Sequence, residues 1–194
     1  MSPERELFLS RLKAFGEAND RVAASRSDKM LNITADTGLF LWMLIRARKP
    51  RRLLEVGTSN GYSTIWWADA LNEPGQTLIT LEANPKKVVQ ARANFKEAEV
   101  ADRIELIEGD AGHFLRAAET ASFDWVFLDS ERSEYVGWWP DLLRVTAADG
   151  LIIVDNAVDK ATEIEAFVNV VQSTPGVRQV LVPIGNGELF IHRT

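Results

Sequence analysis

Acidic residues close two of the most apolar segments of the chain. Asp129 follows Phe123–Leu128, and the pair Asp155 and Asn156 follows Leu151–Val154. If these segments are neighbouring parallel strands, about 4.8 Å apart, their carboxyl ends bring two carboxylates and an amide oxygen to one point. Hard oxygen ligands of this kind suit Mg²⁺, Mn²⁺ or Ca²⁺. The spacing also permits a second interpretation, because an Asp at the end of a strand can cap the next helix.

A glycine-containing turn follows an earlier apolar segment, Leu53–Val56. The turn holds Gly57 and Gly61, and residues with helical spacing come next. Glycines at a strand-to-helix turn let the backbone approach a ligand closely, and doubly wound α/β proteins hold nucleotide-like cofactors at such turns. The dinucleotide fingerprint G-x-G-x-x-G is not present here, because no third glycine follows in register.

Two further acids indicate which cofactor this turn suits. Glu55 lies near the end of the first strand, and Glu82 ends the next apolar segment, 77–81. A carboxylate at Glu55 would repel a pyrophosphate, but it suits a cofactor with an ammonium, a sulfonium and no phosphate, which describes S-adenosylmethionine. An acid after the second strand is placed to bind a ribose through its hydroxyls. The alternative is a turn that merely closes a strand–helix unit, with Glu55 solvated; the position of Glu82 favours the cofactor site.

Alternating strands and helices are expected to position these residues. Strands are predicted near residues 52–56, 77–82, 103–108, 123–129, 150–155, 177–182 and 187–192. Between them, helices are predicted near residues 61–72, 84–98, 111–119, 131–146 and 159–173. This alternation predicts a doubly wound α/β fold with a mostly parallel seven-stranded sheet. Turn residues between the last two segments predict a hairpin, which makes one strand antiparallel.

A helical N-terminal segment, residues 1–49, is expected to precede the sheet core at residues 50–194. Residues 3–18 have helical spacing, and Thr34 is expected to cap a second helix of about 14 residues. The polar stretch 19–30 between them is interpreted as a linker or a mobile cover. The whole chain, 1–194, is expected to form a single domain.

Composition limits the classes of protein that need to be considered. The chain has 194 residues, of which 46% are hydrophobic and 26% charged, as in a soluble globular domain. It has no cysteine, which excludes disulfides and thiolate metal sites. We find no apolar run of membrane-spanning length and no apolar signal core, so a cytoplasmic location without a membrane partner is expected. The net charge of −6 argues against a nucleic-acid partner, and the basic cluster 46–52 falls at the opposite edge of the sheet from the expected site.

Taken together, these residues resemble the cation-dependent O-methyltransferases of the catechol and caffeoyl-CoA type, within the class I S-adenosylmethionine-dependent methyltransferases. The resemblance covers about residues 29 to 192. It rests on the motifs E-V-G-T-S-N-G-Y-S-T (55–64), L-E-A-N-P (81–85), G-D-A (109–111), F-D-W-V-F-L-D (123–129) and I-V-D-N (153–156). It implies the Rossmann-like methyltransferase fold.

The resemblance also implies roles for individual residues. The implied metal ligands are Asp129, Asp155 and Asn156. The implied cofactor-binding residues are Ile33, Glu55, Gly57, Thr58, Gly61, Ser63, Glu82, Asp110, Ala111 and Asp129. Spacing alone leaves two readings of Asp110, which could cap the next helix or touch an adenine.

One position departs from the family pattern. The family usually has a lysine three residues after the first metal-binding Asp, as catalytic base or phenol-orienting cation, and this chain has Arg132. A guanidinium stays protonated, so Arg132 cannot accept a proton, but it can stabilise a phenolate as a fixed cation. Asp129 and Arg132 are therefore the expected catalytic residues. The proton would leave to water or to a residue such as Lys160.

The sequence thus predicts an S-adenosylmethionine-dependent, metal-assisted O-methyltransferase acting on a small hydroxylated acceptor, with a vicinal diol on an aromatic ring. Its rivals are an enzyme that methylates a hydroxylated tRNA base and a module that binds the cofactor without turnover. A nicotinamide oxidoreductase is a remote fourth alternative, disfavoured by Glu55. A homodimer is compatible with the sequence.

Overall fold

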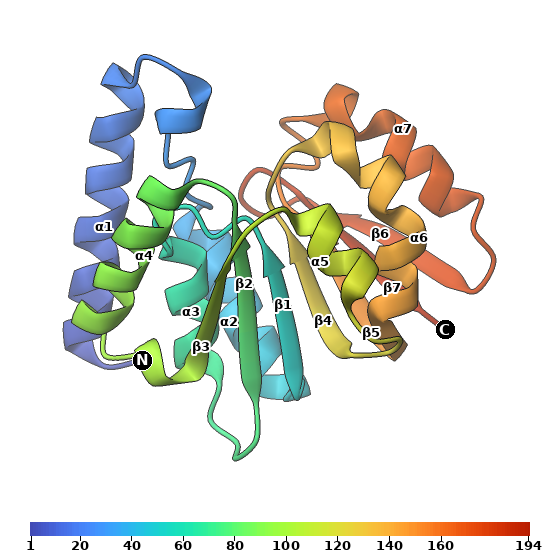
Figure 1. Ribbon diagram of the computed structural model, residues 1–194, viewed down its shortest axis with the longest axis horizontal. Helices are drawn as coiled ribbons and strands as arrows, with labels where there is room; N and C mark the ends of the chain where they lie inside the picture. Colours follow the sequence, from blue (N-terminus) through green and yellow to red (C-terminus); the bar gives the residue numbers. More distant parts are fainter.

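A seven-stranded sheet organises the computed structural model, which describes all 194 residues (Figure 1). Its strands are β1 (Arg52–Val56), β2 (Thr77–Glu82), β3 (Ile104–Glu108), β4 (Phe123–Leu128), β5 (Thr146–Val154), β6 (Val177–Val182) and β7 (Glu188–Arg193). They are ordered β3-β2-β1-β4-β5-β7-β6. Strand β7 is antiparallel to both of its neighbours, and all other pairs are parallel. The predicted mostly parallel sheet with one antiparallel strand is confirmed.

Helices cover both faces of this sheet. They are α1 (Pro3–Val22), α2 (Ala35–Arg48), α3 (Tyr62–Ala70), α4 (Pro85–Glu97), α5 (Ala111–Ala117), α6 (Tyr135–Val145) and α7 (Ala161–Gln172). Helices α1 to α4 lie on one face and α5 to α7 on the other, and each layer has its own buried hydrophobic cluster (Figure 1). Strands buried on both faces explain why the segments of β4 and β5 are so apolar.

The central strands end together at one edge of the sheet. Leu128 of β4 pairs with Val56 of β1 and with Val154 of β5, so the residues that follow these strands lie side by side. The backbone N–H of Asp129 donates to Val56 (3.0 Å), and that of Asp155 donates to Leu128 (3.1 Å). The predicted meeting of Asp129 and Asp155 at the carboxyl edge is therefore confirmed. Strand order reverses between β1 and β4, which is where ligands bind in open α/β sheets.

Several element boundaries differ from the predicted ones. Helix α1 continues to Val22, four residues beyond the prediction. This last turn was not predicted because residues 19–21 are polar and Val22 is exposed, so no apolar period marks it. The predicted helix 131–146 begins as a 3₁₀ turn at Arg132–Glu134, and α6 starts only at Tyr135. Strand β5 begins earlier than expected, since Thr146 already pairs with Phe123 before a register shift.

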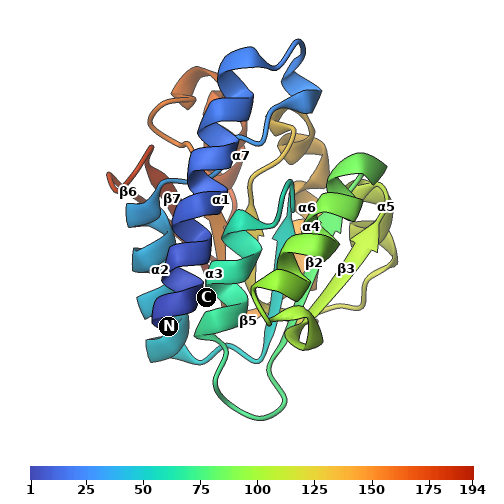
Figure 2. The same cartoon turned by 90° about the vertical axis from the view of Figure 1, so that its left-hand side faces the viewer.

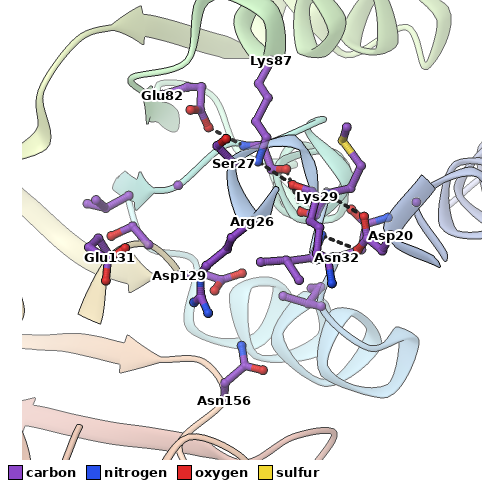
Figure 3. A pocket seen from close by; sticks show the side chains of 18 of the residues that line it. Asp20, Arg26, Ser27, Lys29, Asn32, Glu82, Lys87, Asp129, Glu131 and Asn156 are labelled. Atoms are coloured by element: carbon purple, nitrogen blue, oxygen red, sulfur yellow. Dashed lines mark hydrogen bonds between the residues drawn. The ribbon is translucent and has the colours of Figure 1, made fainter. Parts of the chain in front are cut away.

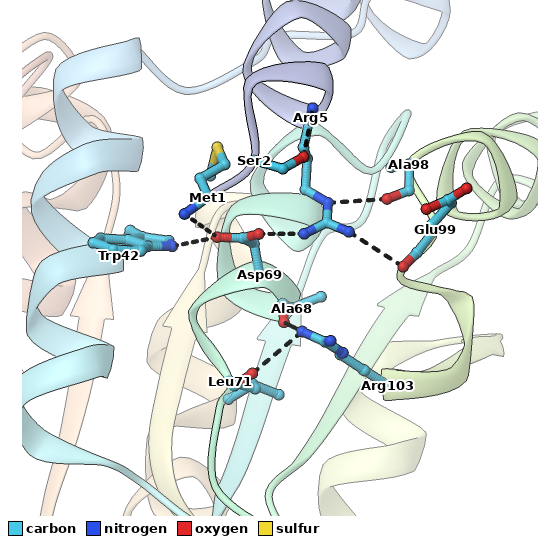
Figure 4. Close-up of polar contacts among 10 residues, drawn as sticks. All are labelled: Met1, Ser2, Arg5, Trp42, Ala68, Asp69, Leu71, Ala98, Glu99 and Arg103. Atoms are coloured by element: carbon cyan, nitrogen blue, oxygen red, sulfur yellow. Dashed lines mark hydrogen bonds and ion pairs between the residues drawn. The ribbon is translucent and has the colours of Figure 1, made fainter.

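The N-terminal helix is anchored at its first turn by a buried carboxylate (Figure 4). Asp69 of α3 pairs with the Arg5 guanidinium and accepts a hydrogen bond from the Trp42 indole at 2.7 Å. Arg5 also donates to the carbonyl of Ala98 at 2.9 Å, so α1 is bound to both α3 and the end of α4. The other end of α1 rises above the carboxyl edge of the sheet, where the segment 23–34 begins (Figure 2). No helix of the structure has the length and apolarity needed to span a bilayer.

Candidate active site at the carboxyl edge

A cavity of about 1450 Å³ opens at the carboxyl edge of the sheet (Figure 3). The turns after the central strands form one side of it, and residues 23–36 form another. Ligand pockets are usually about 300–1,000 Å³, so this volume can accommodate a cofactor together with a second molecule. The predicted site residues that line it are Ile33, Gly57, Glu82, Asp110, Ala111, Asp129, Arg132 and Asn156.

The turn after β1 depends on its two glycines. Gly57 has φ +107°, and a Cβ at this position would collide with the backbone carbonyl of Asp129. Gly61 has φ +86° at the N-terminus of α3, and a Cβ there would collide with the ring of Phe95. Both positions therefore need glycine, because other residues rarely adopt these backbone angles and none would fit the space.

Glu55 does not reach the cavity, although it was expected to touch the cofactor. Its side chain points to the α3 face of the sheet, is fully buried, and accepts hydrogen bonds from four side chains. These are Ser63 (2.5 Å), Thr64 (2.5 Å), Thr80 (2.6 Å) and the indole of Trp67 (3.0 Å). Burial raises the pKa of Glu55, and the four hydrogen bonds oppose this shift. Glu55 of β1 thus holds the first turn of α3 against the sheet.

Three other predicted cofactor residues also lie behind the cavity wall. The hydroxyl of Thr58 contacts that of Thr80 at 2.6 Å, and Ser63 is engaged by Glu55. Gly61 faces Phe95. Thr58 and Ser63 do line a small hollow beneath residues 30–33, next to Gly57 and Asp129. These residues therefore shape the turn, and within it Gly57 and Ser59 border the main cavity.

Glu82 borders the cavity at the end of β2. Its carboxylate accepts hydrogen bonds from the backbone N–H groups of Ser59 and Asn84, both at 2.8 Å. It therefore joins the turn after β1 to the start of α4, which Asn84 caps. Each carboxylate oxygen can accept more than one hydrogen bond, so Glu82 retains capacity for ligand hydroxyls.

Asp110 acts as a helix cap and also borders the cavity. Its carboxylate accepts a hydrogen bond from the backbone N–H of His113 at the start of α5. Ala111 and Trp138 lie next to it in the cavity lining. The Trp138 indole also packs against Gly112, where any Cβ would collide with it.

Asp129 and Asp155 form a pair of like charges in a mostly buried setting. Burial raises the pKa of Asp129 well above its usual value, and the charge of Asp155 raises it further. Burial likewise raises the pKa of Asp155. Asp129 faces the cavity, whereas Asp155 lies behind it and is 2% exposed. The Oδ1 atom of Asp155 is buried and has no hydrogen-bond partner.

Asn156 completes the predicted ligand set, but its amide is engaged in the structure. Its Nδ2 donates to the carboxylate of Asp155, and its Oδ1 accepts from Asn186 at 3.2 Å. No group of three or more His, Asp or Glu side chains lies close enough together to hold a metal ion. A site built on Asp129 and Asp155 would therefore take its third ligand from Asn156, whose amide would turn so that the oxygen faces the carboxylates.

A third carboxylate, not anticipated from the sequence, lies against this pair. Glu188 at the start of β7 is fully buried near the charge of Asp155, and its Oε1 accepts a hydrogen bond from Thr37 of α2 at 2.9 Å. Its Oε2 is buried without a hydrogen-bond partner. Burial, followed by the charge of Asp155, raises the pKa of Glu188 to about 11. The only sequence signal was an acid at the start of an otherwise apolar strand, directly after the turn 185–187.

Arg132 is the principal cation of the site. Only 7% of the residue is exposed. Its guanidinium lies 3.7 Å from Asp129 and 3.6 Å from Glu163 of α7. Glu163 was also missed by the sequence analysis, and it pairs with Lys160 at 3.2 Å. Arg132 thus occupies a fixed position beside the acid pair, at the border of the cavity.

Comparison with known proteins places the chain in a family. A family model described as O-methyltransferase matches residues 13–194. The chain belongs to the O-methyltransferase family. This confirms the resemblance on which the residue assignments were based.

Among curated members of the O-methyltransferase family, a catechol O-methyltransferase from Mycobacterium tuberculosis is 37% identical over 126 residues, 65% of this chain and 57% of the relative. Caffeoyl-CoA O-methyltransferase 1 from Zea mays is 31% identical over 142 residues, 71% of this chain and 55% of the relative. The chain thus spans little more than half the length of these relatives.

Solved structures share the fold of this O-methyltransferase family member over almost its whole length. The cofactor-bound structure of Rv0187 from MTB has a TM-score of 0.81 and 27% identity, covering 96% of this chain and 89% of that one. An O-methyltransferase from Bacillus cereus, in complex with SAH, has a TM-score of 0.81 at 24% identity. The match covers 97% of this chain and 91% of that one. The predicted Rossmann-like methyltransferase fold is confirmed.

Proposed function

We propose that this chain is an S-adenosylmethionine-dependent O-methyltransferase that methylates a vicinal diol on a small aromatic acceptor, assisted by a divalent cation. The observation that carries the proposal is one cavity bordered by the glycine turn, by Glu82 and by the pair Asp129 and Arg132. Membership of the O-methyltransferase family and the named catechol and caffeoyl-CoA relatives support the same activity.

The cofactor would occupy the side of the cavity nearest β1, β2 and β3. Gly57 lets the backbone approach the methionine part, and Glu82 is placed to accept hydrogen bonds from the ribose hydroxyls. Asp110, Ala111 and Trp138 would enclose the adenine. Glu55, Thr58, Gly61 and Ser63 would act through the shape of the turn rather than by direct contact, because hydrogen bonds and neighbouring side chains already engage them.

The residues present fit a divalent cation. Asp129 and Asp155 repel one another, and the buried Oδ1 of Asp155 and Oε2 of Glu188 have no hydrogen-bond partner. Such groups gain from a cation, and hard oxygen donors are those that Mg²⁺ prefers. Asp129, Asp155 and Asn156 would hold the ion, with Glu188 behind Asp155. When bound, the ion lowers the pKa of a hydroxyl that it contacts.

The chain's own residues then perform two tasks. Arg132 stabilises the negative charge that develops on the acceptor oxygen, from a position fixed by Asp129 and Glu163. The turn at Gly57 and the segment 30–33 hold donor and acceptor in line, which supplies much of the acceleration. Arg132 cannot accept the proton, so the proton leaves to water in the open cavity.

Titration calorimetry tests the cofactor assignment. We expect S-adenosylmethionine to bind the purified chain with micromolar affinity and NAD to give no signal, since no phosphate-binding glycine fingerprint is present. Binding of NAD with silent S-adenosylmethionine would overturn the proposed function.

The acceptor assignment is tested with three isomers of dihydroxybenzene. Only the vicinal isomer can present both oxygens to one cation, so we expect methyl transfer to catechol and little to resorcinol or hydroquinone. Equal rates for all three isomers would contradict chelation of both oxygens. They would indicate an O-methyltransferase that needs only one hydroxyl on its acceptor.

A further inference from the structure

Three cations, Arg26, Arg132 and Lys160, border the cavity near Glu163 of α7. Glu163 of α7 lies 3.6 Å from Arg132 and 3.2 Å from Lys160. The hydrogen bond from Lys160, followed by the charges of Lys160, Arg132 and Arg26, lowers the pKa of Glu163. Arg132 is paired with both Asp129 and Glu163, and Lys160 shares Glu163, so Arg26 is left without a carboxylate of its own within 4.0 Å.

Arg26 is the cation in this group without a partner. It lies in the 3₁₀ turn Arg26–Asp28 and is exposed, and its side chain makes no hydrogen bond and no ion pair within 4.0 Å. Figure 3 shows its side chain directed into the cavity, on the side of Asp129 and Asn156. Lys87, which also lines the cavity, is by contrast engaged, because its ammonium donates to the carbonyl of Lys29 at 2.6 Å.

Arg26 shares the cavity with other polar side chains. Arg132, Asn156, Lys160 and Asn186 line the same cavity. An acceptor held between these residues and the acid pair would have its hydroxyls at Asp129 and its opposite end near Arg26 and Lys160. A neutral apolar substituent would gain little here, whereas a planar carboxylate matches the fork of a guanidinium.

We propose that Arg26 and Lys160 bind a carboxylate on the acceptor, so that the substrate is a catechol bearing an acidic substituent. This inference rests on the proposed function and narrows its substrate class. Arg26 belongs to the segment 23–34 that borders the cavity opposite the sheet. Binding of the acid would therefore also draw this segment towards the acceptor and exclude water from the reacting oxygen.

Kinetics with a matched pair of acceptors test this inference. The pair is 3,4-dihydroxybenzoate and its methyl ester, which differ only in the negative charge. We expect the wild-type chain to have the higher kcat/KM for the acid, and Arg26→Ala to lower the acid-to-ester ratio by roughly tenfold to hundredfold, as for loss of hydrogen bonds between charged groups. Arg21→Ala is the control, because Arg21 is an exposed arginine of α1 outside the cavity lining, and its ratio should match the wild type.

The other possible outcomes of these kinetics also test the inference. An unchanged ratio in Arg26→Ala, or equal use of acid and ester by the wild type, overturns the inference while the O-methyltransferase activity stands. A preference for a coenzyme A thioester over the free acid would indicate that Arg26 and Lys160 bind a phosphate, and it would overturn the proposed carboxylate site. If neither acceptor is methylated, the proposed function fails. Binding of the acid and the ester can then still be compared by calorimetry in the presence of S-adenosylhomocysteine and Mg²⁺, which shows whether Arg26→Ala lowers the preference for the acid.

Discussion

The guanidinium of Arg132 lies 3.7 Å from the carboxylate of Asp129, at the border of the cavity. A buried, permanently charged group in this position can stabilise a developing phenolate. We expect Arg132→Ala to lower kcat with catechol on the order of 10²-fold, typical of losing one preorganised electrostatic contact. Arg132→Lys retains the charge and should recover part of this loss. Steady-state kinetics of both variants provide the measurement, and full activity in Arg132→Ala would exclude the role.

Lys160 is the alternative proton acceptor near the acid pair. Its ammonium is already paired with the carboxylate of Glu163 at 3.2 Å. We expect Lys160→Met to lower kcat with neutral catechol by less than about tenfold, well below the 10²–10⁴ of an essential acid–base group. The rate should rise with pH until the acceptor hydroxyl is ionised. Nearly complete loss of activity in Lys160→Met, with Arg132→Ala fully active, would reverse the two assignments.

Glu82 is predicted to contribute directly to cofactor binding. Removing its carboxylate in Glu82→Ala should weaken binding of S-adenosylmethionine by roughly 1.5–3 kcal/mol, as for hydrogen bonds to a charged group. Glu108, its exposed pairing partner in β3, lies outside the cavity lining and carries the same charge. Glu108→Ala is therefore the control, and calorimetry is the measurement. Equal losses in the two variants would indicate a general charge effect rather than a contact.

Glu188 predicts an unusual dependence of stability on pH. Its pKa is raised from 4.5 to about 11 by burial, so the folded chain retains a proton that the unfolded chain releases. The stability contributed by neutral Glu188 is complete below pH 4.5 and is lost as pH rises towards 11. Glu188→Gln resembles the neutral acid and cannot ionise. Relative to the wild type, it should gain up to about 1.4 kcal/mol in unfolding free energy per pH unit in this window.

Urea unfolding of wild type and Glu188→Gln in chelator, at several pH values in that window, measures this gain. The chelator matters because a cation beside Asp155 would favour the ionised form. A difference between the two proteins that stays constant with pH would show that Glu188 is charged in the folded state.

The architecture was predictable because its signals are local. Apolar segments such as Phe123–Leu128 specify buried parallel strands, and caps such as Thr34 mark where helices begin. The end of α1 was misplaced because its last turn is polar on the outside and has no periodic apolar residues. The start of β5 was misplaced because it depends on pairing of Thr146 with Phe123, a contact between distant residues.

The candidate site was predictable only where it follows from strand ends. Gly57, Glu82 and Asp129 come directly from turns at the carboxyl edge, which all parallel strands share. The surroundings of Glu55 were not predicted, because alternation along β1 points its side chain towards α3, where Thr64 and Trp67 donate hydrogen bonds to it. Glu188 was missed because it reaches Asp155 through antiparallel pairing of β5 and β7, which no local pattern encodes.

Methyl transfer from S-adenosylmethionine to catechol, measured by mass spectrometry with Mg²⁺ or with excess chelator, tests the central claim most directly. We expect the monomethylated product and S-adenosylhomocysteine to form in equal amounts with Mg²⁺. Chelator, or the substitution Asp155→Ala, should abolish transfer while calorimetry shows that cofactor binding largely survives. Full activity in chelator would contradict the metal assignment, and no transfer from bound cofactor to catechol or 3,4-dihydroxybenzoate would contradict the account as a whole.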